Sequence, residues 1–487
     1  MDIAAYVADA EKFVSRLTAE YYRHGAGLKE DLDLSRIYEE HRALFAPGAV
    51  ASLVDDRSTP ERRMFAEFAA FGWIENELRG ITDQIGTAEA RSTVAWDGKA
   101  LPWRQASIAI ADEQDRIRRQ DLEQRTAETT AQSNPQREVR LRRSHDLAAG
   151  LGFPDYVALC EQLGQLDLAA LNAEMQRLLA GTEAPYVEEM TRRLSDAGIP
   201  AADATTADWA LLRRGHEFDA IFPKDKLLAA LERTMLGIGI DIGRQQNLRL
   251  DVEDRPLKSP RAFCAPIRVP HEVWLVIRPR GGHDDYNSIM HEAGHAEHFA
   301  HTRPDAPFAF RYLGDNSVTE AYAFLFANLI HNPIWLQDML GAEDFSAYLS
   351  LAHFAEIYML RRYAAKLGYE LELQRSDEPA RFPQRYAEVL GAALHVRVRP
   401  ENFLYDLDDA FYCARYLRAW IAEVQLRRRL QREFGRRWYA SAEAGEYLRS
   451  LWSLGQQFSA EEMAARLGYE GLEVEGVVKE LLSQPGT

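Results

Sequence analysis

Strand-forming patterns are confined to one short part of this chain, and helical patterns lie on both sides of it. Polar and apolar residues alternate in NLRLDV (247–252), and FCAPIRV (263–269) and EVWLVIRP (272–279) follow as two further strand-like segments. Elsewhere apolar residues recur every three or four positions, as they do over residues 4–22 and 63–81. The chain is therefore predicted to be mainly α-helical, with one small sheet.

The strands divide the sequence into two parts. Residues 1–245 are predicted to form a helical N-terminal lobe, and residues 246–487 a second region that begins with the sheet. A chain of 487 residues is long enough for more than one domain, although nothing near residue 245 resembles a flexible linker. Because so few strands are present to cover it, EVWLVIRP is predicted to expose an edge that an extended peptide can pair with.

The charge and cysteine content argue against several classes of protein. Lysine and arginine total 58 against 75 acidic residues, and the net charge of −17 disfavours nucleic acid or an anionic membrane as a partner. The first residues do not resemble a signal peptide, and no run of eighteen apolar residues is present to span a membrane. Cys160, Cys264 and Cys413 are far apart and odd in number, which favours free thiols and a cytoplasmic protein.

The stretch IMHEAGHAEHFAH (289–301) follows the sheet directly and contains four histidines. His291 and His295 are four residues apart, so on a helix they lie on one face and can bind the same metal ion. Glu292 is the next residue around the helix, beside the position of a metal-bound water. This H-E-x-x-H arrangement predicts a zinc site in which Glu292 acts on the water.

Three residues compete to be the third ligand of that site. His301 stands where the H-E-x-x-H-x-x-G-x-x-H pattern places a histidine, but that pattern needs a glycine where this chain has His298. On a continuous helix His298 lies about 10 Å beyond His291, and His301 points away. Glu320 lies on the next predicted helix, where it can also form a capping box with Ser317. The pattern alone leaves both roles open for Glu320.

A resemblance to a known family bears on this choice. Glu320 stands twenty-five residues after His295, and the segments AGHAEHF and TEAYAFLF around them resemble the M3 peptidase family, the thimet oligopeptidase and oligoendopeptidase F group. SPRAFCAPIRVPHEVWLVIRP (259–279) and DDYNSIMHEAGH (284–295) also resemble the strands and the metal helix of that family. The likeness covers roughly residues 145–425.

The resemblance implies a fold and a chemistry. The fold is that of a gluzincin-type metallopeptidase, a two-lobed helical shell around a deep channel with a small sheet next to the H-E-x-x-H helix. One Zn²⁺ is held by His291, His295 and Glu320, and Glu292 transfers the proton during hydrolysis of internal bonds in short peptides. Residues 1–245 then form a wall of the channel, and residues 246–487 the catalytic region. Neither the sequence nor the resemblance indicates an oligomeric state.

The remaining candidates for the site lie in or near a later segment, NFLYDLDDAFYCARYLRAW. This segment resembles the tyrosine-rich helix of the M3 family, in which phenols stabilise the tetrahedral intermediate. Tyr416 and Tyr412 are four residues apart and can share a face, and Tyr416 is the preferred candidate. Arg415 departs from the family pattern and can hold a substrate carboxylate instead. Tyr405 and His395 are further candidates for the substrate-binding wall.

Two other interpretations of the motif stay open. One is a different zinc hydrolase with the same two histidines, either through the His301 pattern or as an M32-like metallocarboxypeptidase. The other is a non-catalytic helical binding protein in which the motif has decayed. Release of single C-terminal residues would indicate the carboxypeptidase. A chain that purifies without metal and cuts no peptide when zinc is added would indicate the binding protein.

Overall fold

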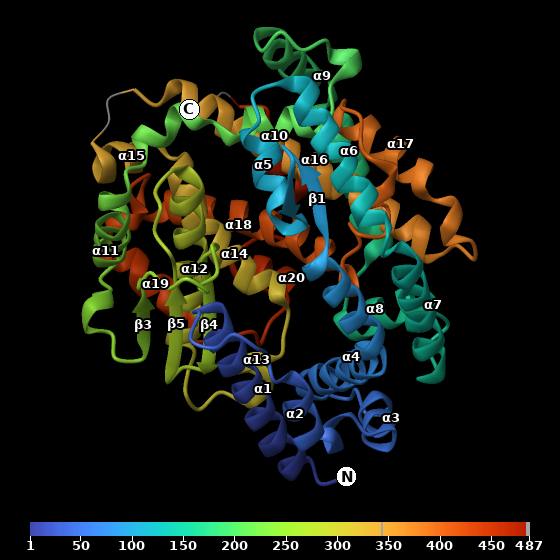
Figure 1. Ribbon diagram of the computed structural model, residues 1–487. Coiled ribbons are helices and arrows are strands. Elements are labelled where there is room, and N and C mark those ends of the chain that lie inside the picture. The colour runs from blue at the N-terminus through green and yellow to red at the C-terminus, as the bar shows by residue number, and fades with distance from the viewer. Residues whose placement is uncertain (342–343, 484–487) are drawn as a thin grey trace.

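Helices make up most of the structure, a computed structural model that describes residues 1–341 and 344–483 (Figure 1). The α-helices before the three-stranded sheet are α1 (Ile3–Gly25), α2 (Leu34–Glu40), α3 (Pro47–Asp55), α4 (Pro60–Arg91), α5 (Ala106–Asp112), α6 (Arg116–Ala131), α7 (Asn134–Gly150), α8 (Tyr156–Gly164), α9 (Leu168–Asp196), α10 (Thr206–Arg214) and α11 (Leu227–Gly237). Those after it are α12 (His283–His301), α13 (Phe308–Tyr312), α14 (Asn316–Ala327), α15 (Pro333–Leu340), α16 (Ser346–Gln374), α17 (Pro383–Leu394), α18 (Tyr412–Phe434), α19 (Ala442–Trp452), α20 (Ala460–Arg466) and α21 (Val474–Leu481). None of the helices in the described ranges is long and apolar enough to cross a membrane.

Local sequence determines where the first long helices begin. The Asp2 carboxylate accepts a hydrogen bond from the amide of Ala4 at 3.0 Å and caps α1. Thr59 caps α4 in the same way, and Pro60 follows in the first turn, where a missing amide proton costs nothing. The structure thus confirms both helices, which the apolar spacing predicts.

The predicted sheet consists of β3 (Leu248–Asp251), β4 (Phe263–Arg268) and β5 (Glu272–Val276). The strand order is β3-β5-β4, with β5 parallel to β3 and antiparallel to β4. The prediction that EVWLVIRP exposes an edge is wrong, because β5 pairs with a strand on each side. Among the described strands, β3 and β4 are the two edge strands of this sheet, and β5 lies between them.

Helix α12 packs on one face of this sheet and α1 on the other (Figure 1). Val273 and Leu275 of β5 share a hydrophobic cluster with Ile289 of α12. The ring of Trp274 stacks instead on Tyr22 of α1, with 4.6 Å between the ring centroids. The period of two that predicts the strand thus divides its side chains between two helices. This packing fixes α12 against the sheet.

Two large hydrophobic clusters fill the interior. The first joins the N-terminal helices to α16, α17 and α18 and includes Phe13 and Tyr369. The second surrounds α12 and the three-stranded sheet and includes Phe222 and Trp335. Because both clusters contain residues from each side of residue 245, the division into 1–245 and 246–487 stays a prediction.

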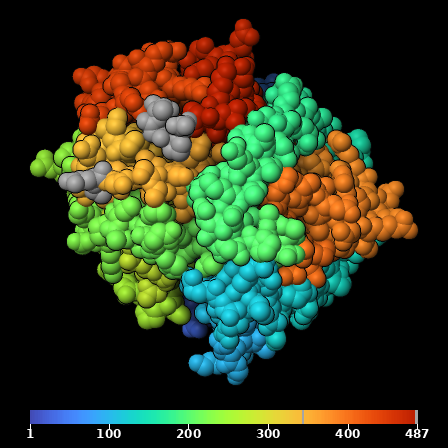
Figure 2. All heavy atoms as spheres, turned by 90° about the horizontal axis from the view of Figure 1, so that it is seen from above, coloured from blue at the N-terminus to red at the C-terminus, as the bar shows by residue number. Residues whose placement is uncertain are grey.

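Segments from both sides of residue 245 also meet at the surface. Seen from above, the green residues of α9 lie between the red C-terminal helices and the cyan segment near α5 (Figure 2).

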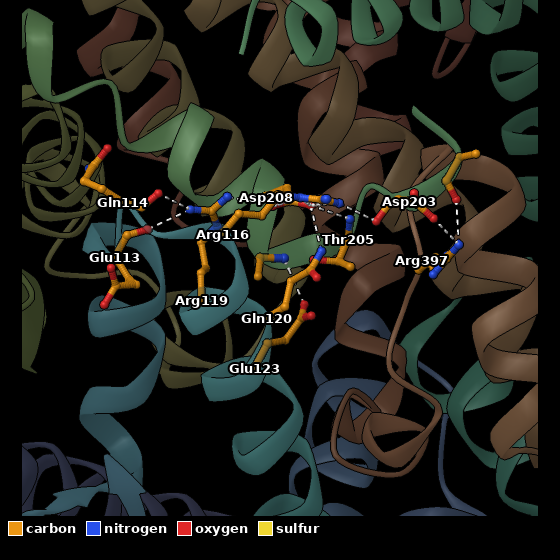
Figure 3. Close-up of polar contacts among 12 residues, drawn as sticks. Glu113, Gln114, Arg116, Arg119, Gln120, Glu123, Asp203, Thr205, Asp208 and Arg397 are labelled. Atoms are coloured by element: carbon orange, nitrogen blue, oxygen red, sulfur yellow. Dashed lines mark hydrogen bonds and ion pairs between the residues drawn. The ribbon is translucent and has the colours of Figure 1, made fainter. Parts of the chain in front are cut away.

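A buried polar cluster joins α10 to α6 (Figure 3). The Asp208 side chain is fully buried, and its Oδ1 accepts a hydrogen bond from Nη2 of Arg119 at 2.7 Å. Its Oδ2 accepts one from the amide of Thr205 at 3.1 Å, as part of a capping box at the start of α10. Arg116 adds an ion pair at 3.3 Å. The buried carboxylate is therefore fully compensated by partners from two elements.

A short hairpin, β1 (Thr93–Trp96) and β2 (Lys99–Pro102), lies outside the predicted strand region. Asp97 and Gly98 form its two-residue turn, and both have positive φ, 51° and 69°. Asp-Gly is a favoured pair for such a turn, because both positions need the left-handed region. This dipeptide is the sequence signal that could have located the hairpin.

Candidate metal centre

Three side chains from two neighbouring helices converge in the structure. His291 and His295 of α12 and Glu320 of α14 each offer one ligand atom, and these atoms lie within 4.8 Å of one another. Nε2 of His291 is 3.4 Å from Oε2 of Glu320, and Nε2 of His295 is 3.5 Å from it. Two imidazoles and one carboxylate form the donor set of open, catalytic zinc sites. The structure thus brings together the three residues expected as ligands.

The spacing of the two helices depends on a glycine inside the motif. A Cβ atom built on Gly294 would lie 2.5 Å from the carbonyl oxygen of Tyr322 and 2.6 Å from Cα of Ala323. Both contacts are with the main chain of α14, so a larger side chain could not be accommodated without moving a helix. Gly294 therefore allows α12 and α14 to approach closely next to His295.

The start of α14 tests the capping role considered for Glu320. The N-cap is Asp315, whose carboxylate accepts a hydrogen bond from the amide of Ser317 at 3.0 Å. Ser317 lies inside the helix, and its hydroxyl accepts a hydrogen bond from Arg418 at 2.9 Å. The capping-box interpretation is therefore wrong. Glu320 lies one turn further along and faces α12.

The electrostatics of the three side chains fit a cation. Glu320 is 5% exposed, and its Oε2 makes no hydrogen bond of acceptable geometry to any described residue. Burial alone would raise the pKa of Glu320, but His291 and His295 outweigh it and hold the pKa well below its usual range. Burial opposes the charged form of His295, yet the Glu320 carboxylate raises its pKa. A buried carboxylate oxygen that faces two imidazole nitrogens is satisfied by a divalent cation.

Two further contacts orient the candidate ligands. Nδ1 of His295 lies 2.8 Å from the hydroxyl of Thr319, which leaves Nε2 facing Glu320. The hydroxyl of Tyr412 donates a hydrogen bond to Oε1 of Glu320 at 2.8 Å. Outer contacts of this kind fix the tautomer and the direction of metal ligands. Thr319 was not among the expected residues, because no sequence pattern shows which hydroxyl will face a histidine on another helix.

Glu292 lies between the metal ligands and the sheet. Its Oε2 accepts a hydrogen bond from the amide of Cys264, on β4, at 2.8 Å. The Cys264 amide therefore points away from β5 and towards α12. Sequence reasoning did not identify this contact, since it depends on β4 rather than β5 being the edge strand. Glu292 is held beside the ligand cluster, as a group that acts on a bound water requires.

Tyr412 and Tyr416 both lie beside the cluster, but only the Tyr412 hydroxyl is hydrogen-bonded to a described residue. Their rings are 4.9 Å apart, and the ring of Tyr416 is 5.8 Å from that of Phe324. Tyr412 is engaged with Glu320, whereas the Tyr416 hydroxyl makes no hydrogen bond within the described parts of the chain. Burial, and then the Glu320 carboxylate, raise the pKa of Tyr416 above its usual value. Tyr416 thus remains a protonated donor available to another group.

Arg415 points elsewhere. Its guanidinium is 2.5 Å from the Glu67 carboxylate and 3.5 Å from that of Asp315, and the residue is 5% exposed. A guanidinium already paired with two carboxylates is not available to hold a substrate carboxylate. The expected substrate-binding role of Arg415 finds no support in this placement, because the ion pairs link α18 to α4 and to the start of α14.

Two other candidates for the substrate wall also lie away from the cluster. His395 forms an ion-pair contact with Glu183 of α9, with 2.7 Å between Nε2 and Oε1. Tyr405 packs edge-on against Trp103, with 5.4 Å between ring centroids, and is 48% exposed. Both residues instead contact side chains from the first 245 positions of the chain.

The last two histidines of the motif do not join the ligands. His298 is fully buried, and its ring stacks against Phe299 with 5.2 Å between centroids. Burial lowers the pKa of His298 to about 3, so the imidazole is neutral. Nδ1 of His301 lies 3.2 Å from the Glu297 carboxylate, one turn back along α12. The helix continues through position 298, as the absence of a glycine there predicts.

Comparisons with known proteins bear on the fold. No protein-family model matches the sequence, and no curated protein matches it. A solved structure described as a "putative oligoendopeptidase F" from Bacillus anthracis str. Ames matches with a TM-score of 0.67 and 14% sequence identity. The match covers 97% of this chain and 88% of that chain. The two chains share a fold. The mainly α, oligoendopeptidase F-like architecture expected from the sequence is thereby confirmed.

Proposed function

We propose that the chain is a zinc-dependent oligopeptidase that hydrolyses internal bonds of short peptides. The convergence of His291, His295 and Glu320 next to Glu292 supports this most directly. The fold shared with a protein named as an oligoendopeptidase supports peptides as the substrate class. One zinc ion held by these ligands would act as a Lewis acid towards a water molecule and a peptide carbonyl.

Each side chain of the site has a separate role in the proposed hydrolysis. Glu292 accepts the proton of the attacking water at its carboxylate and delivers it to the leaving amine. The Cys264 amide keeps that carboxylate in place beside the ligands. Tyr416 donates its phenolic hydrogen bond to the oxyanion that develops on the peptide carbonyl, and the donor is present before the charge forms. Tyr412 holds Glu320 in its ligand position.

The outer edge of β4 is suited to hold the substrate. The amide of Cys264 on this edge reaches Glu292, so the edge runs past the proposed site of cleavage. An extended peptide that pairs with β4 would place its backbone over that site. In this proposal residues 1–245 form a wall of the channel through which the peptide enters. The three free cysteines favour a cytoplasmic location.

Metal analysis combined with product mapping tests the proposal. Wild type, Glu292→Gln and the control His301→Ala are expected to contain one zinc per chain, and Glu320→Ala is expected to lose it. Glu292→Gln should reduce turnover by about 10²–10⁴-fold, because the proton has no acceptor. Retained activity in Glu292→Gln, or loss of zinc in His301→Ala, would contradict the assigned roles.

Mass-spectrometric mapping of products from a mixed peptide library identifies the reaction. Cleavage at internal bonds is the expected outcome. Stepwise release of single C-terminal residues would indicate an M32-like metallocarboxypeptidase instead. A chain without zinc that cuts no peptide after zinc is added would indicate a non-catalytic binding protein.

A further inference from the structure

A cavity of about 200 Å³ begins at His291, on the side away from the sheet. It lies between the first half of α12, the end of α14, α16 and α18. Much of its wall is apolar and comes from Phe324, Leu351, Met359 and Trp420. The rings of Phe324 and Trp420 stack with 4.9 Å between centroids and an interplanar angle of 2°, which makes this wall rigid. The proposed hydrolysis gives the cavity no role.

The charged residues in the cavity wall are mostly acidic. They are Asp284, Glu356 and Glu423, against one arginine, Arg213, among the described lining residues. The charge of Glu423 is neutralised by Arg427, whose Nε lies 2.6 Å from the Glu423 carboxylate. Glu356 has no hydrogen bond or ion pair with any residue that the structure describes. The cavity therefore contains a carboxyl group that makes no direct contact with a described cation, since the nearby Arg427 is paired with Glu423 and Glu480.

The surroundings of Glu356 disfavour its ionised form, because no positive charge among the described residues contacts the carboxyl group. Burial, and then the Glu480 carboxylate, raise its pKa to about 8; Arg427 opposes this shift and Glu423 adds to it. A positive charge placed in the cavity would favour the ionised form of Glu356 and form a desolvated ion pair with it. His331 contributes a second polar group, because its buried Nδ1 has no partner in the described parts of the chain. Burial lowers the pKa of His331 to about 4, so the imidazole is neutral and does not repel a cation.

We infer that this cavity is the subsite for a lysine or arginine side chain of the substrate, with Glu356 as its partner. The inference rests on the proposed function, because His291 places the cavity next to the bond to be cut. The apolar wall would pack along the methylene stem, whose burial is favourable when the charged end is paired. An acidic side chain would be repelled, and an uncharged one would leave Glu356 unpaired. The net charge of −17 also attracts cationic peptides.

Matched peptides test the subsite in the zinc-loaded protein. The peptides differ only in carrying lysine or uncharged norleucine on either side of the cleaved bond, and kcat/KM is measured for each. Wild type is expected to prefer lysine at one of these positions by at least about tenfold. Glu356→Gln should bring that ratio close to one. Glu372→Gln is the control, because Glu372 lies on the same helix but is paired with Arg385; it should retain the ratio.

Each outcome separates the subsite from the proposed function. Cleavage by wild type without a basic preference, or an unchanged ratio in Glu356→Gln, overturns the subsite and leaves the peptidase intact. If no peptide is cut by the zinc-loaded chain, the proposed function fails and the subsite fails with it. Should Glu356→Gln not fold, Glu356→Asp retains the charge and is expected to preserve part of the preference. A lysine-to-norleucine ratio in Glu356→Asp equal to that of wild type would also overturn the assignment, because this substitution withdraws the carboxylate by one methylene group.

Discussion

The hydroxyl of Tyr412 donates a hydrogen bond from α18 to Oε1 of Glu320 on α14, at 2.8 Å. The other oxygen of that carboxylate faces His291 and His295. One oxygen is therefore held by a phenol while the other is directed at the proposed ion. This arrangement gives Tyr412 a positioning role and distinguishes it from its neighbour Tyr416.

Tyr412→Phe is expected to weaken zinc binding by about 10–100-fold, because the Glu320 ligand loses its outer partner. The phenyl ring fills nearly the same space, so the fold should be retained. Titration against a chromophoric chelator measures the affinity directly. Unchanged zinc affinity in Tyr412→Phe would show that the hydrogen bond does not orient the ligand.

Tyr416→Phe is expected to have the opposite signature. Zinc affinity should be unchanged, since the Tyr416 hydroxyl does not contact a ligand, while kcat falls by about 10²–10³-fold from loss of an oxyanion donor. Steady-state kinetics on one internally cleaved peptide, with zinc content measured on the same preparation, separates the two effects. Equal losses of zinc in both phenylalanine variants would contradict the division of roles.

Asp208→Ala is expected to lower the free energy of unfolding by about 3–5 kcal/mol, because it leaves the buried Arg119 without its partner carboxylate (Figure 3). Asp203→Ala is a matched control in the same view. Its ion pair with Arg397 is exposed on both sides, and exposed pairs contribute about 0–1 kcal/mol. Urea unfolding at neutral pH measures both. Similar losses in the two variants would indicate that burial of the Asp208 cluster is unimportant.

The buried His298 predicts a loss of stability in mild acid. Its pKa is lowered to about 3 in the folded chain, against about 6.5 for an unperturbed histidine, so the unfolded chain binds the proton first as the pH falls. The stabilisation is complete above pH 6.5 and decreases between pH 6.5 and 3. From pH 7 to pH 5 the loss is about 2 kcal/mol. His298→Gln should show a pH dependence smaller by this amount in urea unfolding at the two pH values, and an identical dependence would refute it.

Patterns within a single element predicted most of the architecture. The apolar period identified α1 and α4, alternation identified β3, and strand-like segments after it identified β4 and β5. The predictions that failed depend on which elements lie next to one another in the fold. The apolar run of β5 indicates a strand, but it carries no information about backbone partners, so an edge was assigned to β5, which in the structure lies between β3 and β4.

The same limit explains the results at the site. His291 and His295 are related by the helix period alone, so their convergence could be predicted from local sequence. The environment of Arg415 depends on Glu67, nearly 350 positions earlier in the chain, and no local pattern shows that ion pair. The contact between Glu292 and the Cys264 amide likewise needs the position of the sheet edge. Resemblance to a family supplied Glu320, whose role spacing alone could not decide.

The absent side chain of Gly294 has a consequence for how this chain can change. Because α12 approaches the main chain of α14 so closely there, the separation of the two backbones that carry the histidines and Glu320 is set by the helix pair. Part of the wall around Glu356, by contrast, comes from α16 and α18, which include Leu351, Met359 and Trp420 and take no part in that contact. If the proposed function and subsite hold, substitutions in that part of the wall can alter which peptides are accepted while the positions of the three proposed ligands stay the same. Metal affinity and substrate preference could then change independently of one another.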